Sequence, residues 1–497
     1  MFWKIAKKEF LLNIMTFKFA IGTILCVILT CVFVPILAQD YQKQLKNYNA
    51  NIANNEAELR KTMVYKNIAP TVYRPPNVLS IFSEGVEKRL NTSAKIDLGS
   101  VPEINTTSTE INPYMSMFPP FDISLILRVV FSTLALLVAY NVISGEREQG
   151  TLKLILSNKI SRHEILLGKI LAGLVILIVP VTIIFVLGLL FLLSFPMIEL
   201  TVSDWARIGL LYITSLIFIS AMYNLGLFFS ALMKRSAISL VLGLFAWVIF
   251  VVIIPNGSIH LATQIHPLKP EEKIEGQRAL AMQEFREKLT EVFRKFPHIR
   301  GPKSDAEGAF GKCYSVVCDN SCLQDASKYY PLAERLRINY GDSLWKIELS
   351  YFNSLLKQNN LAKNIARISF ISSYENAMSI LAQSDLTSFQ CFMDNAKAYR
   401  NNVIEYIRSK TENFASLSYF TICTKGDWEK YQKTKEWKHK KVIETSPLNL
   451  QDFPLFTHQF SVAESLKKAI PDIMLLLFFN VLLFILSFVA FIRYDVR

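Results

Sequence analysis

The chain has 497 residues, of which 51% are hydrophobic and 19% charged, and its formal net charge is +13. A soluble chain of this length carries more charge and divides its apolar residues among two or three cores, whereas here they gather in long runs. The positive charge does not indicate nucleic-acid binding, because the basic residues form no patch with interleaved aromatic residues. Membrane proteins carry such a balance, since Lys and Arg flank their cytoplasmic span ends.

Residues 1–18 precede the first apolar run and combine Phe2, Trp3, Phe10 and Leu11 with lysines. This composition suits an interfacial amphipathic helix whose ammonium groups lie near anionic lipid, or equally a plain helical extension of the first span. A cleaved signal peptide is disfavoured, because the apolar run is too long for one and no A-x-A site follows it.

Six apolar runs are long enough to cross a bilayer as helices, which takes about 20 residues. The backbone of such runs must satisfy its own hydrogen bonds in lipid, and this predicts helices. From Ile123 onward the second run contains a single ionised residue, Arg128. The predicted spans are residues 19–38, 122–144, 170–195, 208–233, 236–254 and 473–492.

Charges in the short loops predict the orientation, because Lys and Arg mark the cytoplasmic side. The loop 145–169 and the tail 493–497 are rich in basic residues, whereas 196–206 has two acidic residues and neither Lys nor Arg. Both termini are therefore predicted to be cytoplasmic. The long segments 39–121 and 255–472 are predicted to be extracytoplasmic.

Helical periodicity continues inside these long segments. Residues 270–296, 332–366 and 388–414 each place apolar side chains on one face, which predicts long helices that pack as antiparallel pairs. Segment 39–121 looks helical to about residue 65, and its remainder, rich in Pro, Asn, Ser and Thr, is predicted to be irregular. The fold class predicted is an all-α membrane protein with six transmembrane helices and a mostly helical extracytoplasmic domain.

Five of the seven cysteines fall in the predicted extracytoplasmic region, where an oxidising compartment favours disulfides. Their odd number leaves at least one thiol unpaired in a monomer. A metal site is disfavoured, because no His lies close by in sequence and the spacing departs from a C-x₂₋₄-C pair. The candidates for disulfides are Cys313, Cys318, Cys322, Cys391 and Cys423.

The loop 145–169 carries the most specific pattern in the chain. A polar stretch followed by an apolar one predicts a short amphipathic helix on the membrane surface, which offers Glu146, Arg147 and Glu148 to a cytoplasmic partner. Ser161 and Glu164, three residues apart, predict a capping box at the start of the third span. From charge alone, the same loop would be a solvated turn.

This loop resembles the segment between the second and third spans of type-2 ABC transporter permeases. In that family an acidic-basic-acidic run precedes Gly-Thr-Leu, and a Ser-Arg-x-Glu-Ile-x-x-Gly-Lys stretch begins the next helix. The stretch Lys7-Lys8-Glu9-Phe10 is similar to the family as well, and the ending 491–497 is similar to the subgroup with a large insertion before the last span. Asn141 departs from the acidic residue of many relatives, and 39–121 is poorly matched.

The resemblance implies a coupling helix that docks in a cleft of an ATPase, and a partner protomer that is identical or paralogous. An extracytoplasmic partner is a separate candidate, because the external domain is large enough for the same ATPase-driven motion to work on it. Carried over by position, the docking face would consist of Glu146, Arg147, Glu148, Gly150, Thr151 and Leu152.

Nucleotide chemistry is not expected in this chain, because it contains no G-x-x-x-x-G-K-[ST] loop to hold phosphates. We expect no cofactor here, with ATP and Mg bound to a separate ATPase subunit. Motifs of metalloproteases and of serine hydrolases, H-E-x-x-H and G-x-S-x-G, are also absent from the sequence.

Arg128, Asn224 and Asn480 are polar residues inside apolar spans. They could line a pathway between two protomers, since polar groups in spans often mark one. Alternatively the asparagines hydrogen-bond neighbouring helices and Arg128 reaches the outer interface with its long side chain. The second interpretation is favoured.

The sequence therefore predicts a permease subunit of an ATP-driven exporter, multi-pass in the bacterial cytoplasmic (inner) membrane. Two rivals stay open. One is a mechanotransmitter that works on extracytoplasmic partners without moving cargo across the bilayer, and the other is a non-transport membrane scaffold. Nothing in the sequence names the substrate.

Overall fold

The computed structural model describes residues 2–15, 17–62, 64–90, 92–99, 121–157, 161–297, 299, 315–317, 320–423, 447–458 and 461–493. Six helical runs in this part of the chain are long and apolar enough to cross a membrane. They are α2 (Phe17–Arg60); α3 (Ile123–Leu125), η5 (Ile126–Phe131), α4 (Ser132–Ala139) and α5 (Ser144–Glu148) in sequence; α7 (Arg162–Leu193); α8 (Val202–Leu232); α9 (Ser236–Val248), η6 (Ile249–Ile253) and α10 (Ile254–Ile265) in sequence; and α17 (Val462–Ile492).

The remaining described elements are mostly helical, which confirms the predicted all-α class. The helices are α1 (Phe2–Ile14), α6 (Thr151–Ser157), α11 (Glu271–Arg294), α13 (Asn320–Ala366), α14 (Phe370–Leu381) and α15 (Leu386–Lys410), with single turns η1 (Tyr65–Asn67), η2 (Val78–Ile81) and η3 (Glu87–Arg89). Strand β1 (Thr71–Tyr73) pairs antiparallel with β2 (Ser93–Lys95), and β3 (Ser315–Val317) pairs parallel with β4 (Thr421–Cys423).

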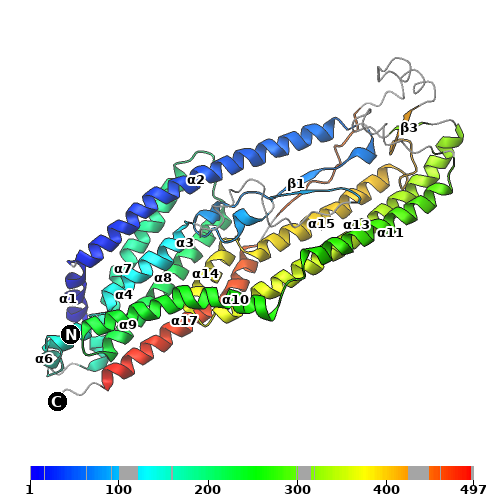
Figure 1. The fold of residues 1–497 in the computed structure, drawn as a ribbon. Helices are drawn as coiled ribbons and strands as arrows, with labels where there is room; N and C mark the ends of the chain where they lie inside the picture. Colours follow the sequence, from blue (N-terminus) through cyan, green and yellow to red (C-terminus); the bar gives the residue numbers. More distant parts are fainter. Residues whose placement is uncertain are drawn as a thin grey trace.

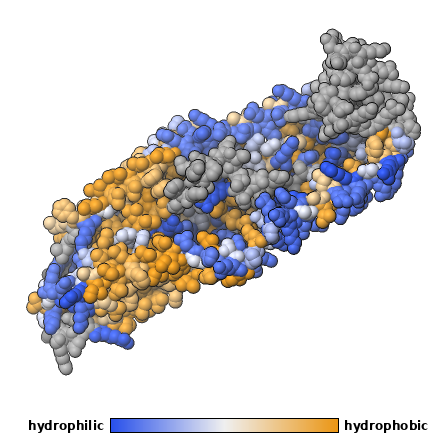
Figure 2. All heavy atoms as spheres, viewed as in Figure 1, coloured by the Kyte–Doolittle hydropathy of each residue, from blue (hydrophilic) through white to orange (hydrophobic). Residues whose placement is uncertain are grey.

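The molecule is elongated, and its elements divide between two ends (Figure 1). One end carries α1, α6 and the C-terminal end of α17, and we call it the loop end. The other half is built from α11, α13, α15 and the far part of α2, and we call it the distal domain. Hydrophobic residues cover the spans, and hydrophilic ones cover the distal domain and the rim of the loop end (Figure 2).

Several helices run straight out of the span bundle into the distal domain. Helix α2 has 44 residues, so at 1.5 Å per residue it is about 66 Å long, about twice the hydrocarbon thickness. Span 5 continues through α10 to Ile265. Helix α13 has 47 residues and packs along α11. Helix α2 and span 5 thus connect the span bundle directly to the distal domain.

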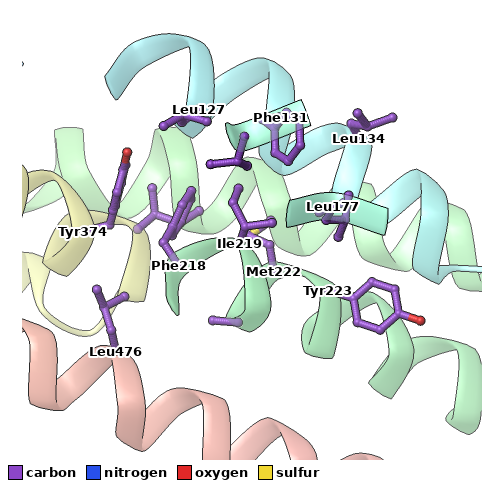
Figure 3. Close-up of a cluster of buried hydrophobic side chains, with 14 of the residues drawn as sticks. Leu127, Phe131, Leu134, Leu177, Phe218, Ile219, Met222, Tyr223, Tyr374 and Leu476 are labelled. Atoms are coloured by element: carbon purple, nitrogen blue, oxygen red, sulfur yellow. The ribbon is translucent and has the colours of Figure 1, made fainter. Parts of the chain in front are cut away.

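The buried hydrophobic residues form two cores. One lies in the distal domain, between α13, α15 and the segment that contains β1 and β2. The other lies among the spans, where Leu127, Leu177, Phe218 and Leu476 come from four different spans and meet around α8 (Figure 3). Helix α8 is the centre of the bundle, whereas α9 and α17 expose many large apolar side chains, as helices in contact with lipid do.

Helix α14 belongs to the span core, although the predicted boundaries put residues 370–381 in the distal domain. Its buried side chains include Phe370, Tyr374 and Met378, and Tyr374 stacks on Phe218 of α8 with ring centroids 4.1 Å apart. Helix α14 also packs against α17 and η6. The apolar face of α14 is compatible with any core, so the sequence pattern alone could not assign it.

Candidate functional site

The loop between the second and third spans folds as α5, a turn at Gln149 and Gly150, and α6. Gly150 has a φ of +73°, in the left-handed region that favours glycine. This conformation ends α5 and turns the chain into α6. The start of α5 is held by Ser230 of α8, whose Oγ accepts hydrogen bonds from the backbone N–H groups of Ile143 and Ser144 at 2.9 and 3.0 Å.

A buried ion cluster lies directly behind α5. Lys169, near the start of α7, has a side chain that is 1% exposed, and its Nζ lies 2.8 Å from Glu9 Oε1 and 2.9 Å from Glu146 Oε1. It also donates to the carbonyl of Val142 at 3.0 Å. The two carboxylates come from α1 and α5, so one ammonium group joins three elements. Two carboxylates and a carbonyl satisfy all three of its donor positions.

The next two charged residues of the motif hold the turn between spans 4 and 5. The guanidinium of Arg147 donates to the carbonyls of Ala231 and Met233 at the end of α8, both at 3.0 Å. Glu148 Oε2 accepts from the N–H of Ser236, at 3.1 Å, and from its hydroxyl, at 2.7 Å, at the start of α9. The positive Arg147 thus caps the C-terminal end of α8, and the negative Glu148 caps the N-terminal end of α9. These are the charges that the helix dipole favours at those ends.

Of the six residues expected to form the docking face, Glu148 and Gly150 are exposed, Glu146, Arg147 and Thr151 are partly buried, and Leu152 is fully buried. Their docking role stays a prediction. Glu146 and Arg147 point into the chain, and Leu152 is fully buried, so it anchors α6. The sequence pattern did not reveal this, because Lys169 lies on the next span and the partners of Arg147 lie 84 and 86 residues further along the chain. Among the described side chains of α5, the turn and α6, the exposed ones are those of Glu148, Gln149, Lys153, Leu154 and Ser157, together with Gly150, and Thr151 is partly buried.

The two long spans behind the cluster are in close contact. Gly173 of α7 lies against the ring of Tyr223 of α8, where a Cβ would come within 2.1 Å of the ring carbon Cζ. The hydroxyl of Tyr223 donates to the carbonyl of Lys169 at 3.0 Å. Helices α7 and α8 therefore hold the Lys169 backbone as well as its side chain.

Helix α7 starts at Arg162 with Ser161 at its N-cap position, but the predicted capping box is wrong. The Ser161 side chain makes no capping bond and instead lies 3.2 Å from His163 Nε2. A capping box does occur at the start of α8, between Thr201 and Asp204. Arg162 donates to the carbonyl of Ile492, so the start of α7 also contacts the end of the last span.

Asn224 and Asn480 join two spans. Asn224 Nδ2 donates to Asn480 Oδ1 at 3.1 Å, and Asn480 Nδ2 donates to the carbonyl of Ile217 at 2.9 Å. The first bond links α8 to α17, and so does the second. This geometry supports the favoured interpretation of the two asparagines as interhelical contacts.

Arg128 lies in η5, a π-helical segment, and pairs with Glu375 of α14 at 2.5 Å. Its carboxylate partner is a contact that the sequence did not indicate. A second π-helical segment, η6, offers the carbonyl of Phe250 to the hydroxyl of Ser369, at 2.8 Å. Both π-helical segments thus contact the region of α14, and such segments are frequent at functional positions.

The distal domain is tied to the last span by one bidentate ion pair. Arg367, just before α14, donates from Nε and Nη2 to the two carboxylate oxygens of Asp472 in α17, both at 2.8 Å. The Asp472 side chain is fully buried, whereas that of Arg367 is 33% exposed. Together with the Arg128–Glu375 pair, this contact fixes α14 between the spans.

Of the five candidate cysteines, Cys391 has a described side chain, and it carries a free thiol. Asn395 Nδ2 lies 3.8 Å from its sulfur, and burial raises the pKa of the thiol. Cys391 therefore forms no disulfide here. Cys313 and Cys318, and the side chains of Cys322 and Cys423, lie outside the described part of the chain, so their pairing stays a prediction.

In the part of the chain that the structure describes, no group of three or more His, Cys, Asp or Glu side chains could hold a metal ion. Among its polar groups, the Lys169 cluster and the adjoining bonds of Arg147 and Glu148 lie together at the loop between the second and third spans.

Comparison with known proteins identifies a family over almost the whole chain. A family model described as ABC-2 family transporter protein matches residues 3–496. The match covers α1, all six spans and the distal domain. A search of curated proteins found no match.

Proposed function

Because the chain belongs to the ABC-2 transporter family, we propose that it is the permease subunit of an ATP-driven exporter, powered by a separate ATPase that docks at the loop end. In this proposal the loop end faces the cytoplasm of a bacterial cell, with both termini on that side. The basic residues of the short loops support this orientation.

The observation that carries the proposal is the way in which α5 is attached. Glu146 joins it to α1 and α7 through Lys169, Arg147 joins it to the end of α8, and Glu148 joins it to the start of α9. A force on the exposed surface of the loop therefore reaches spans 3, 4 and 5 together. Packed elements of this kind move as near-rigid bodies.

We assign the docking contact to the outward residues of the loop. Leu154 is 69% exposed on α6 beside exposed Lys153, and such apolar side chains within a polar rim are typical of protein interfaces. Glu148 remains exposed while it caps α9, so it can contact a partner from the same position. ATP binding on the partner would then push α5 and α6 against the spans.

The test is co-purification of the full chain with its ATPase, comparing Leu154→Asp with Leu455→Asp. Leu455 is 85% exposed in the distal domain and gives a matched control, because both variants place a charge at an exposed position. We expect Leu154→Asp to lose the ATPase and Leu455→Asp to retain it. Normal ATPase binding and normal transport by Leu154→Asp would contradict the assignment.

A second variant separates binding from coupling. Glu148→Lys removes the two bonds to Ser236 and places a positive charge at the positive end of α9, next to Arg235. We expect the ATPase to stay bound and to hydrolyse ATP while transport falls. Glu148→Gln, which can still accept a hydrogen bond, should retain more transport than Glu148→Lys.

Mechanical work on an extracytoplasmic partner is the second candidate function. It is supported by the helices that continue from the spans into the distal domain and by the Arg367–Asp472 pair that ties this domain to the last span. Stimulation of ATP hydrolysis by a transported lipid or peptide supports export. Stimulation by a partner of the distal domain, with no cargo crossing the bilayer, supports mechanical work.

We also propose that two protomers, identical or paralogous, form the complete transporter. Helices α2, α9 and α10 expose large apolar side chains such as Ile28, Phe245 and Ile259, and these surfaces suit contact with lipid or with a second permease. Cross-linking of Phe245→Cys in native membranes, in a background without other reactive cysteines, tests this dimer. Absence of any cross-linked pair along α9 would exclude this surface as the interface.

A further inference from the structure

Helix α1 has two faces of different chemistry. Ala6 and Glu9 are buried against α7, where Glu9 meets Lys169. The opposite face exposes Trp3, Lys7, Leu11 and Ile14, spaced four, four and three residues apart as on one helical stripe. Lys8 and Met15 are exposed beside this stripe.

The stripe continues the hydrophobic surface of the spans. Phe17, the first residue of α2, is 85% exposed, and Ile21 and Ile24 follow on the same helix. In Figure 1, α1 turns away from the direction of α2 at the loop end, where the hydrophobic region of Figure 2 meets a hydrophilic rim. A helix at this boundary places apolar side chains in the hydrocarbon edge and its lysines at the level of the headgroups.

From this geometry we propose that α1 is an anionic-lipid sensor, which holds the α5–α6 loop in position through Glu9, Lys169 and Glu146. The occupant is an anionic phospholipid headgroup, because Lys7 and Lys8 are exposed while the single acidic residue of α1, Glu9, faces Lys169. A neutral headgroup offers no net charge for these two ammonium groups. This inference does not depend on the ATPase.

The buried cluster supplies the link from lipid to loop. Glu9 and Glu146 bind the same ammonium group, at 2.8 and 2.9 Å. When α1 is held at the membrane surface, Lys169 keeps both carboxylates and α5 keeps its place. When α1 lifts, Glu9 withdraws, and Lys169 and Glu146 lose the geometry that satisfied them. A buried charge that loses a partner is costly, so α5 must shift.

Hydrogen–deuterium exchange of the full chain tests the proposal. The probes are vesicles of phosphatidylcholine alone, or of phosphatidylcholine mixed with phosphatidylglycerol. Each lysine near an anionic surface changes the equilibrium by about fivefold. With two lysines we therefore expect α1 amides to exchange up to about 25-fold more slowly in the anionic vesicles. Amides of α5 should be protected in parallel, and high salt should reduce both effects.

Two variants and a control make the outcome decisive. Lys7→Gln with Lys8→Gln should abolish the effect of phosphatidylglycerol on both helices. Glu9→Gln should keep the lipid effect on α1 and lose it on α5. Lys346→Gln with Lys357→Gln removes the same charge from exposed positions of α13 and should change nothing. Equal exchange of the wild-type α1 amides in both kinds of vesicle would overturn the lipid site. It would indicate that these lysines bind a protein partner instead. Unaltered transmission to α5 in Glu9→Gln would overturn the link.

Discussion

Ion pairs at the two ends of the span bundle differ in burial. At the loop end, Lys169 is buried and binds two carboxylates. At the distal end, Arg367 is 33% and Arg128 19% exposed in their pairs with Asp472 and Glu375. A buried, fully bonded charge tolerates little displacement, whereas a pair that reaches solvent can exchange its partner for water. The cation at the loop end is therefore more closely enclosed than the two cations at the distal end.

The largest effect is expected from Lys169→Met, which leaves Glu9 and Glu146 buried without their cation. Removal of one partner from a buried pair costs about 3–5 kcal/mol. Adding Glu9→Gln and Glu146→Gln should recover much of this loss, because no unpaired charge then remains. Thermal unfolding of the purified chain measures this loss of stability and its recovery. Lys153→Met, at an exposed position, is the control. If Lys169→Met and Lys153→Met were equally stable, the ion pairs at the loop end would contribute no more to stability than an exposed lysine. The contrast with the distal end of the span bundle would then not hold.

A smaller effect, about 2 kcal/mol, is expected from Arg367→Ala, the loss typical of hydrogen bonds to a charged group. It leaves the buried Asp472 carboxylate without its two donors, but the pair already reaches solvent. Arg367→Lys keeps the charge and loses the bidentate geometry, so it should fall between wild type and Arg367→Ala. Arg335→Ala, at an exposed position of α13, the helix that ends just before Arg367, is the control for thermal unfolding. A loss as large as that of Lys169→Met would show that both ends are equally rigid.

Gly173→Ala tests the helix contact behind the Lys169 cluster. The added methyl group meets the Tyr223 ring, and overpacking of this kind costs about 1–3 kcal/mol. Gly209→Ala in α8 is the matched control, because nothing lies within 4 Å of its added Cβ. Thermal unfolding should separate the two variants. If both melt like wild type, α7 and α8 are not closely fixed at the loop end.

The smallest effect is expected from pH in the distal domain. Burial, and after it the charge of Arg74, lowers the pKa of His458 below its ordinary value of 6.5. The unfolded chain therefore binds this proton more readily, so stability falls as the pH drops below 6.5. His458→Gln should reduce this slope when unfolding is followed between neutral and mildly acidic pH. An unchanged slope would mean that other groups produce it.

The spans, the helical class and the family resemblance could all be predicted from the sequence. Apolar runs of 20 residues leave a chain in lipid few alternatives, because the backbone must satisfy its own hydrogen bonds. The boundaries were less predictable. Helix α2 continues to Arg60 since nothing in its polar continuation stops a helix, and α14 joined the span core because its apolar face fits any core.

By itself the sequence determined where charged residues interrupt the apolar runs and that residues 145–157 form a specific motif. Only the tertiary structure decided which way that motif faces. Glu146 turns inward because Lys169, and beyond it Glu9, lie within hydrogen-bonding distance once α1, α5 and α7 pack together. The periodicity of a segment gives no information about a partner more than a hundred residues away along the chain. The burial of Lys169 among three helices depends on such a partner, Glu9.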